Sequence, residues 1–124
     1  MGEGFGAYTI GNDDALLKIV RSANVACGFH GGDPNVMHHL VTRAGEEGVS
    51  IGAHPGFNDL LGFGRRRIDM NLRDIEYSIA YQIGALQAGI AKGGLQLDRR
   101  VAEPVPGRQV VGKELGQLFG EVQV

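Results

Sequence analysis

Two short apolar segments, each leading to a histidine that precedes turn residues, constrain the fold of this chain more than any other feature. The first segment leads to His30 and the second to His54. Apolar runs of this length predict β-strands over residues 23–27 and 49–53. In α/β proteins, sites are built where parallel strands end and the loop to the next helix begins. Since the two segments lie about one βα unit apart, we expect adjacent parallel strands with both histidines close together at one pocket.

In three segments around these strands, the apolar residues have the spacing of one face of a helix. These segments cover residues 13–20, 34–47 and 71–92. Asp33 is the predicted N-cap of the second helix, which Gly48 ends. The apolar residues that predict the buried side of the long third helix are Leu72, Ile75, Ile79, Ile83, Leu86 and Ile90.

The order helix, strand, helix, strand, helix indicates an α/β protein with parallel strands and right-handed crossovers. Two strands cannot form a parallel sheet that is buried on both faces, so we expect part of a larger α/β fold. Residues 95–101 are a poor third strand because charged side chains interrupt them. The loop over residues 55–70 is long for this class, and ordered loops of that length are often functional.

Composition narrows the class of protein. A chain of 124 residues, 43% of them hydrophobic and 21% charged, is large enough for one small globular domain but not for two. The net charge of −2 gives no basic surface for nucleic acid or an anionic membrane. Cys27 is the single cysteine, so no internal disulfide can form and we expect a cytoplasmic protein. No apolar run reaches about 18 residues, and the start lacks a signal-peptide pattern.

His30 and His54 are the strongest candidates for chemistry. An imidazole at the end of a strand can bind a metal, carry a proton or orient a carbonyl; the alternative is a hydrogen-bonded structural histidine. A metal site needs a third ligand, and Glu3 and Asp33 are the candidates. Asp33 precedes Pro34 and fits a plain N-cap equally well, while Glu3 lies in a glycine-rich loop with no helix face to occupy.

Three other reactive side chains are predicted to be structural. His38 and His39 are adjacent in a helix and point about 100° apart, so they cannot both face one site. Cys27 lies in a buried strand with no evident base beside it, which favours a small core residue over a nucleophile.

Five motifs carry a resemblance to a known family. They are Gly-Glu-Gly-Phe-Gly at residues 2–6, the histidine segments at 22–34 and 52–55, the loop at 59–66 and the helical segment at 81–86. With these motifs the chain resembles the LamB/YcsF family of 5-oxoprolinase A subunits over about residues 1–94. The resemblance implies a partial (β/α) barrel of the glycoside hydrolase/deacetylase type. It also implies ATP-coupled opening of 5-oxo-L-proline to L-glutamate, with ATP as co-substrate and subunits B and C as partners.

Two parts of the family pattern are not matched. Family members begin with a strand ending in an Asp-Leu-Asn-x-Asp motif, and they continue after the glycine pair at 93–94 with a strand ending in Lys-Pro-His-Gly. Residues 95–124 show no such motif, so we expect a non-matching tail that is not a domain. From these departures we expect the chain to represent an N-terminal part of the barrel and to be inactive alone.

The resemblance adds roles to the candidate residues. It favours function over a structural role for His30 and His54, and the predicted catalytic residues are Glu3, His30, Asp33 and His54, with a metal left open. Opening a lactam with ATP requires groups that hold phosphate, and Arg65 and Arg66, with Arg67, are the candidates; the alternative is a solvated basic loop. No P-loop motif is present in the sequence. Two other hypotheses stay open, a metal-dependent hydrolase of the deacetylase kind and a non-catalytic remnant that binds a partner subunit.

Overall fold

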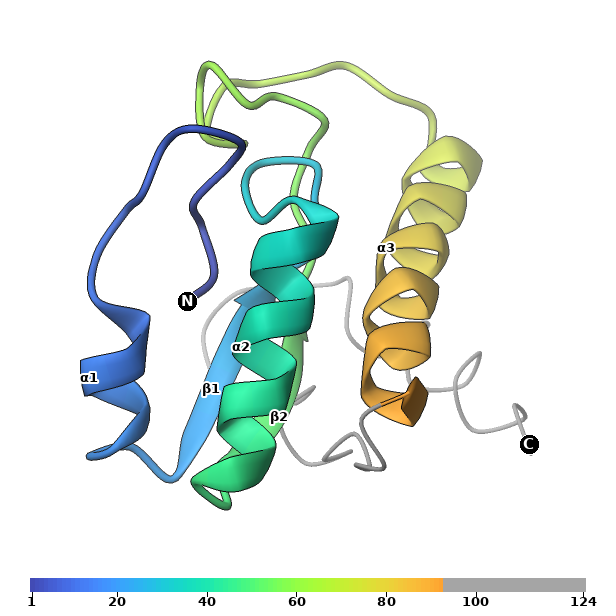
Figure 1. Ribbon diagram of the computed structural model, residues 1–124. Helices are drawn as coiled ribbons and strands as arrows, with labels where there is room; N and C mark the ends of the chain where they lie inside the picture. The colour runs from blue at the N-terminus through green and yellow to red at the C-terminus, as the bar shows by residue number, and fades with distance from the viewer. Residues whose placement is uncertain (93–124) are drawn as a thin grey trace.

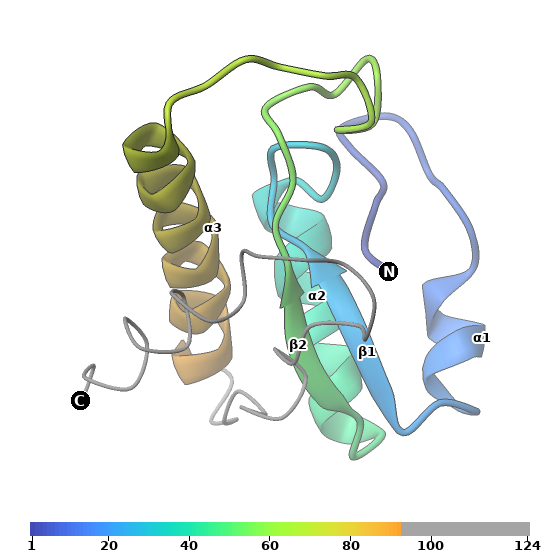
Figure 2. The same ribbon diagram turned by 180° about the vertical axis from the view of Figure 1, so that it is seen from behind.

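The parallel strand pair expected from the two histidine segments forms the centre of the structure. The computed structural model describes residues 1–92, and it contains helices α1 (Asp13–Leu17), α2 (Pro34–Glu46) and α3 (Leu72–Lys92) and strands β1 (Ser22–Ala26) and β2 (Ser50–His54). β1 and β2 pair in parallel, with Ala26 opposite His54. α2 lies across one face of the sheet, α1 on the β1 side and α3 on the β2 side (Figures 1 and 2). The predicted α/β class with parallel strands is confirmed.

One face of the sheet is apolar and the other is polar or small. Along each strand the side chains alternate between the faces, so Ala23 and Val25 of β1 share a face with Ile51 of β2. They pack into the core with buried α2 residues such as Leu40 and Val41. The opposite face carries small and polar residues, which are Ser22, Asn24, Ala26, Ser50, Gly52 and His54. The alternation therefore places His54 away from the hydrophobic core.

The N-terminal segment lies along the edge of β1 opposite β2. The Met1 ammonium donates to the Asn24 carbonyl oxygen at 2.7 Å, and the Ala26 N–H donates to the Met1 carbonyl oxygen at 3.0 Å. These two bonds have the pattern of a parallel ladder. They carry the chain from Met1 toward the carboxyl end of β1, which is where the two histidines also lie.

The helix boundaries follow the predicted caps, with one correction. Asp33 caps α2 as predicted, and Gly48, at φ +68°, follows its end. The first helix ends at Leu17, so its predicted extension to residue 20 is wrong. Ile19 and Val20 are β-branched and poor helix formers; Ile19 is 77% exposed while Val20 turns back against the core.

The predicted apolar side of α3 is correct only in part. Leu86 and Ile90 are buried in the core, but Leu72 is 83% exposed, so its place on the buried side is wrong. The first turn of α3 extends past the end of β2 (Figure 1), beyond the sheet against which Leu86 and Ile90 pack. None of the helices within residues 1–92 is both long and apolar enough to cross a membrane. The predicted tail over residues 95–124 and the poor strand at 95–101 lie outside the described residues.

Candidate functional site

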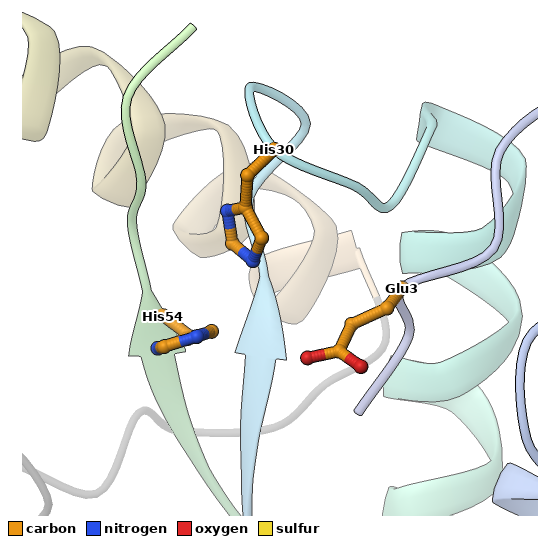
Figure 3. Close-up of side chains that lie close together, drawn as sticks. All are labelled: Glu3, His30 and His54. Atoms are coloured by element: carbon orange, nitrogen blue, oxygen red, sulfur yellow. The ribbon is translucent and has the colours of Figure 1, made fainter. Parts of the chain in front are cut away.

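Glu3, His30 and His54 form a cluster at the carboxyl ends of the strands (Figure 3). Each residue offers one nitrogen or carboxylate oxygen, and these atoms all lie within 4.8 Å of one another. The two imidazole rings meet edge to face with their centroids 4.9 Å apart. The prediction that the two histidines lie close together is confirmed, and of the two candidate third groups the structure brings in Glu3.

The three side chains reach the cluster from three different segments. His54 is the last residue of β2, whereas His30 lies in a tight turn four residues beyond β1. The turn is closed by the Gly28 N–H, which donates to the Gly31 carbonyl oxygen at 2.8 Å. Gly28 has a φ of +100°, a conformation that favours glycine, so the turn depends on that residue.

Glu3 is held in place through its backbone. The Gly32 N–H donates to the Gly4 carbonyl oxygen at 2.9 Å, which joins the N-terminal segment to the turn after β1. A Cβ on Gly31 would lie 2.9 Å from the Glu3 carbonyl oxygen, and one on Gly32 would lie 2.5 Å from the Gly2 carbonyl oxygen. Both positions thus need glycine for the backbones to approach this closely.

His30 is enclosed by the loop that follows β2. The residue is 4% exposed, and a Cβ on Gly56 would lie 2.4 Å from its Nδ1 atom. A Cβ on Gly64, in the same loop, would lie 2.9 Å from the Cβ atom of His30. The Phe63 ring meets the His30 imidazole edge to face, with the ring centroids 5.4 Å apart. Neither ring nitrogen of His30 has a hydrogen-bond partner among residues 1–92. The ring is therefore buried in a fixed orientation with its polar atoms unused.

The environment favours neutral imidazoles. Burial is the main cause that lowers the pKa of His30, and proximity to His54 lowers it further, while Glu3 opposes these effects. Loss of hydration is also the main cause that lowers the pKa of His54, followed by the N-terminal ammonium. Neutral imidazoles have a free lone pair at neutral pH, so each can accept a proton or bind a cation.

Asp33 lies outside the cluster. One carboxylate oxygen accepts from the Asn35 N–H at 2.7 Å and the Val36 N–H at 3.1 Å, and the other accepts from the Gly6 N–H at 2.7 Å. The Val36 and Gly6 hydrogen bonds are the main causes that lower the pKa of this carboxyl. Its position favours the N-cap interpretation; the catalytic role stays a prediction without support from this geometry.

The three arginines of the long loop differ in their surroundings. Arg66 pairs with the buried carboxylate of Asp59, and this hydrogen bond is the main cause that lowers the pKa of Asp59 to about 2. Arg67 pairs with exposed Asp69. Arg65 makes no ion pair within residues 1–92, and its charge contributes to the lowered pKa of both clustered histidines. Of the arginines predicted to hold substrate or phosphate, Arg65 is thus the better placed.

The structural predictions for His38, His39 and Cys27 agree with the structure. Both histidines are exposed on α2, and His39 hydrogen-bonds Asp14 at 3.1 Å. Cys27 is 3% exposed and donates to the Val25 carbonyl oxygen at 3.3 Å, and burial is the main cause that raises its thiol pKa.

Gln82 is a positioning residue that the sequence analysis did not single out. Its side chain is fully buried on α3 and forms two hydrogen bonds with the backbone of Gly56. It accepts from the Gly56 N–H at 2.9 Å and donates to the Gly56 carbonyl oxygen at 3.0 Å. A glutamine inside an apolar helix face was the available signal, because such a residue needs a buried hydrogen-bond partner.

A cavity of about 260 Å³ lies between the loop that encloses His30 and helix α3. Its lining is mostly apolar and consists of Pro55, Gly56, Phe57, Gly64, Met70, Ile75, Ser78 and Ile79. Because Gly56 and Gly64 belong to this lining and also contact His30, the cavity and the cluster share a wall.

Replacing Gly56 by alanine is expected to displace the His30 ring, because the added Cβ would lie 2.4 Å from Nδ1. The measurement is the ¹H–¹⁵N spectrum of the histidine ring nitrogens, in which the His30 signals should shift. Gly84→Ala on α3 is the control, since nothing lies within 4 Å of a Cβ there. It should leave those signals unchanged and stabilise the chain by up to about 1 kcal/mol. Unshifted His30 signals in Gly56→Ala would contradict the described packing.

Comparisons with known proteins agree with one another. The LamB/YcsF family model matches residues 1–99. The chain is 60% identical over 94 residues to the first 5-oxoprolinase A subunit of Bradyrhizobium diazoefficiens, a match that covers 76% of this chain and 37% of that protein. It is 62% identical over 88 residues to the 5-oxoprolinase A subunit of Gluconobacter oxydans, covering 71% and 35%.

A solved structure extends the comparison to the fold. The crystal structure of the lactam utilization protein from Thermus thermophilus matches with a TM-score of 0.76 and 46% sequence identity. The match covers 78% of this chain and 39% of that one. The chain therefore spans between about a third and two fifths of the length of these relatives.

Proposed function

Because this chain belongs to the LamB/YcsF family, we propose that it carries part of the site of an ATP-dependent 5-oxoprolinase, in the A subunit, which opens the lactam of 5-oxo-L-proline to L-glutamate. The observation that carries the proposal is the cluster of Glu3, His30 and His54, which lies wholly within the matched residues. Relatives named as 5-oxoprolinase A subunits and a neighbour named lactam utilization protein support the choice of substrate class.

We also propose a barrel fold for the whole subunit and an assembly with two partner subunits. β1, α2, β2 and α3 have the order of successive units in a (β/α) barrel, and we assign them to a barrel of the glycoside hydrolase/deacetylase type. ATP is the proposed co-substrate, and subunits B and C are the proposed partners. Since ATP is a cytoplasmic metabolite, we assign the assembly to the cytoplasm.

The chemistry that the cluster supports is ring opening by water. The water oxygen bonds to the lactam carbonyl carbon, the carbon–nitrogen bond breaks, and the ring nitrogen takes a proton to become the amine of glutamate. An amide is unreactive toward water, so in this proposal ATP first transfers its γ-phosphoryl group to the lactam carbonyl oxygen and leaves as ADP. After the ring has opened, a second water hydrolyses the resulting acyl phosphate to glutamate and inorganic phosphate. Neutral His54 is suited to take the proton from water, and Arg65 is suited to neutralise phosphate charge.

A chimeric protein tests the proposal. In it, the segment of this chain that aligns with the Bradyrhizobium protein replaces its counterpart there, over 94 residues at 60% identity. Combined with subunits B and C of that organism, the chimera is expected to form glutamate and ADP within about tenfold of the parent rate. A folded chimera without turnover would overturn the proposal and favour the non-catalytic alternative. Ring opening that needs no ATP would favour the metal-dependent hydrolase.

A further inference from the structure

The cluster contains a donor set that is typical of transition-metal sites. Two imidazoles and one carboxylate converge from three chain segments, with their ligand atoms within 4.8 Å of one another (Figure 3). Two atoms that each lie about 2.1 Å from a tetrahedral zinc ion are about 3.4 Å apart. Small rotations of the half-buried Glu3 and the exposed His54 would bring the atoms to that separation.

The unused nitrogens of His30 are an independent observation that points to a ligand. The residue is 4% exposed, and neither ring nitrogen has a partner within the described residues. Gly56 packs against Nδ1, so Nε2 is the nitrogen that faces the space between Glu3 and His54 (Figure 3). Buried polar atoms in proteins almost always have a hydrogen-bond partner or a ligand. A cation held by all three residues would give His30 Nε2 such a partner.

From these two observations we propose that Glu3, His30 and His54 bind one first-row divalent transition-metal ion, with Zn²⁺ as the probe to use first. Imidazole nitrogens with a single carboxylate suit Zn²⁺ and its neighbours, whereas Mg²⁺ and Ca²⁺ prefer oxygen ligands throughout. Three protein ligands leave a coordination position open, and the exposed side of His54 gives solvent and small molecules access to it. The inference goes beyond the proposed function and does not depend on it, because binding is measured without turnover. With the ion bound, the His54 lone pair would serve as a ligand, and the ion would take over from His54 the activation of water.

The chain offers a matched control in a second histidine–carboxylate pair. His39 Nε2 and Asp14 Oδ1 lie 3.1 Å apart on the surface. Arg43 lies 3.4 Å from the same carboxylate oxygen, and its positive charge opposes a cation there. The pair has the same ligand types as the cluster but lacks a third donor and burial.

The test is a Zn²⁺ titration of the 124-residue chain, made without a histidine tag, stripped with a chelator and measured in competition with a chromophoric chelator. We expect one ion per chain and a loss of affinity of at least about tenfold in Glu3→Gln and in His54→Asn, because each variant lacks one of three ligands. His39→Asn should bind as the unchanged chain does. Circular dichroism of each variant checks that the chain is folded, and Glu3 and His54 are not buried in the core, so their replacement spares it.

The ring nitrogens of His30 give a second measurement that needs no substitution. Bound Zn²⁺ should shift the ¹⁵N resonance of His30 Nε2 strongly and leave those of His38 and His39 in place. The proposal is overturned if the folded chain binds no Zn²⁺ at micromolar concentration. It is equally overturned if Glu3→Gln and His54→Asn bind as tightly as the unchanged chain, or if the shifted signals belong to His38 and His39.

Discussion

His54→Ala in the chimeric protein is expected to lower 5-oxoproline-dependent ATP turnover by about 100-fold or more, the usual contribution of a positioned acid or base. His54 ends β2 with its side chain on the polar face of the sheet, in reach of Glu3 and His30. Because the side chain is exposed and outside the core, its removal should leave the fold intact. The effect is therefore expected on turnover and not on stability. The difference in ADP release with and without 5-oxoproline measures the turnover, and chemical denaturation measures the stability.

His39→Ala is the control for that experiment. His39 is also exposed, but it lies on α2 beside Asp14 and belongs to no part of the cluster. Its replacement should leave turnover within about twofold of the chimera, since surface substitutions away from a site have small effects. Equal turnover in His54→Ala and His39→Ala would show that the cluster is not the site.

Gln82→Leu is expected to give the largest loss of stability among polar replacements in the described residues. Leucine preserves volume but leaves the Gly56 N–H and carbonyl oxygen without their partners, at a cost of about 1–3 kcal/mol for each buried group. Chemical denaturation of the chain measures this change as a lower free energy of unfolding. Since Gly56 also contacts His30, the His30 ring signals should broaden or shift in the same variant.

Gln87→Leu serves as the matched substitution, because Gln87 lies on the same helix with an exposed side chain. Its free energy of unfolding should change by less than about 0.5 kcal/mol, as is usual for surface positions. A similar small change in Gln82→Leu would mean that the Gly56 contacts are not formed in solution.

The arrangement of His30 and His54 could be predicted because it depends on few rules. Strand length, a connecting helix and the handedness of parallel connections bring two successive strand ends to one edge. The ends of α2 could be predicted from Asp33 and Gly48 for a similar reason, since caps act within a few residues. In both cases the relevant forces act locally along the chain.

The other features of the site and its surroundings depend on contacts that form only in the folded chain, and these could not be predicted from the sequence. Asp59 and Arg66 pair inside a loop without periodicity, so neither could be assigned a partner beforehand. Gln82 lies 26 residues from Gly56, and only packing of α3 against the sheet brings them together. From the sequence, Asp33 fits an N-cap and a catalytic group equally well. Only the folded chain brings the Gly6 N–H to its carboxylate beside the Asn35 and Val36 N–H groups of the helix start.

The dependence of Glu3 on Gly31 and Gly32 has a consequence for how this site would look in a saturation mutagenesis map. Both glycines lie against the backbone of the N-terminal segment and offer no reactive group, yet almost any replacement would push Glu3 away. Intolerance would then be strongest at positions with no side chain, and weaker at neighbours that carry charge. A search for the site that scored only ionisable residues would overlook the positions whose loss damages it most.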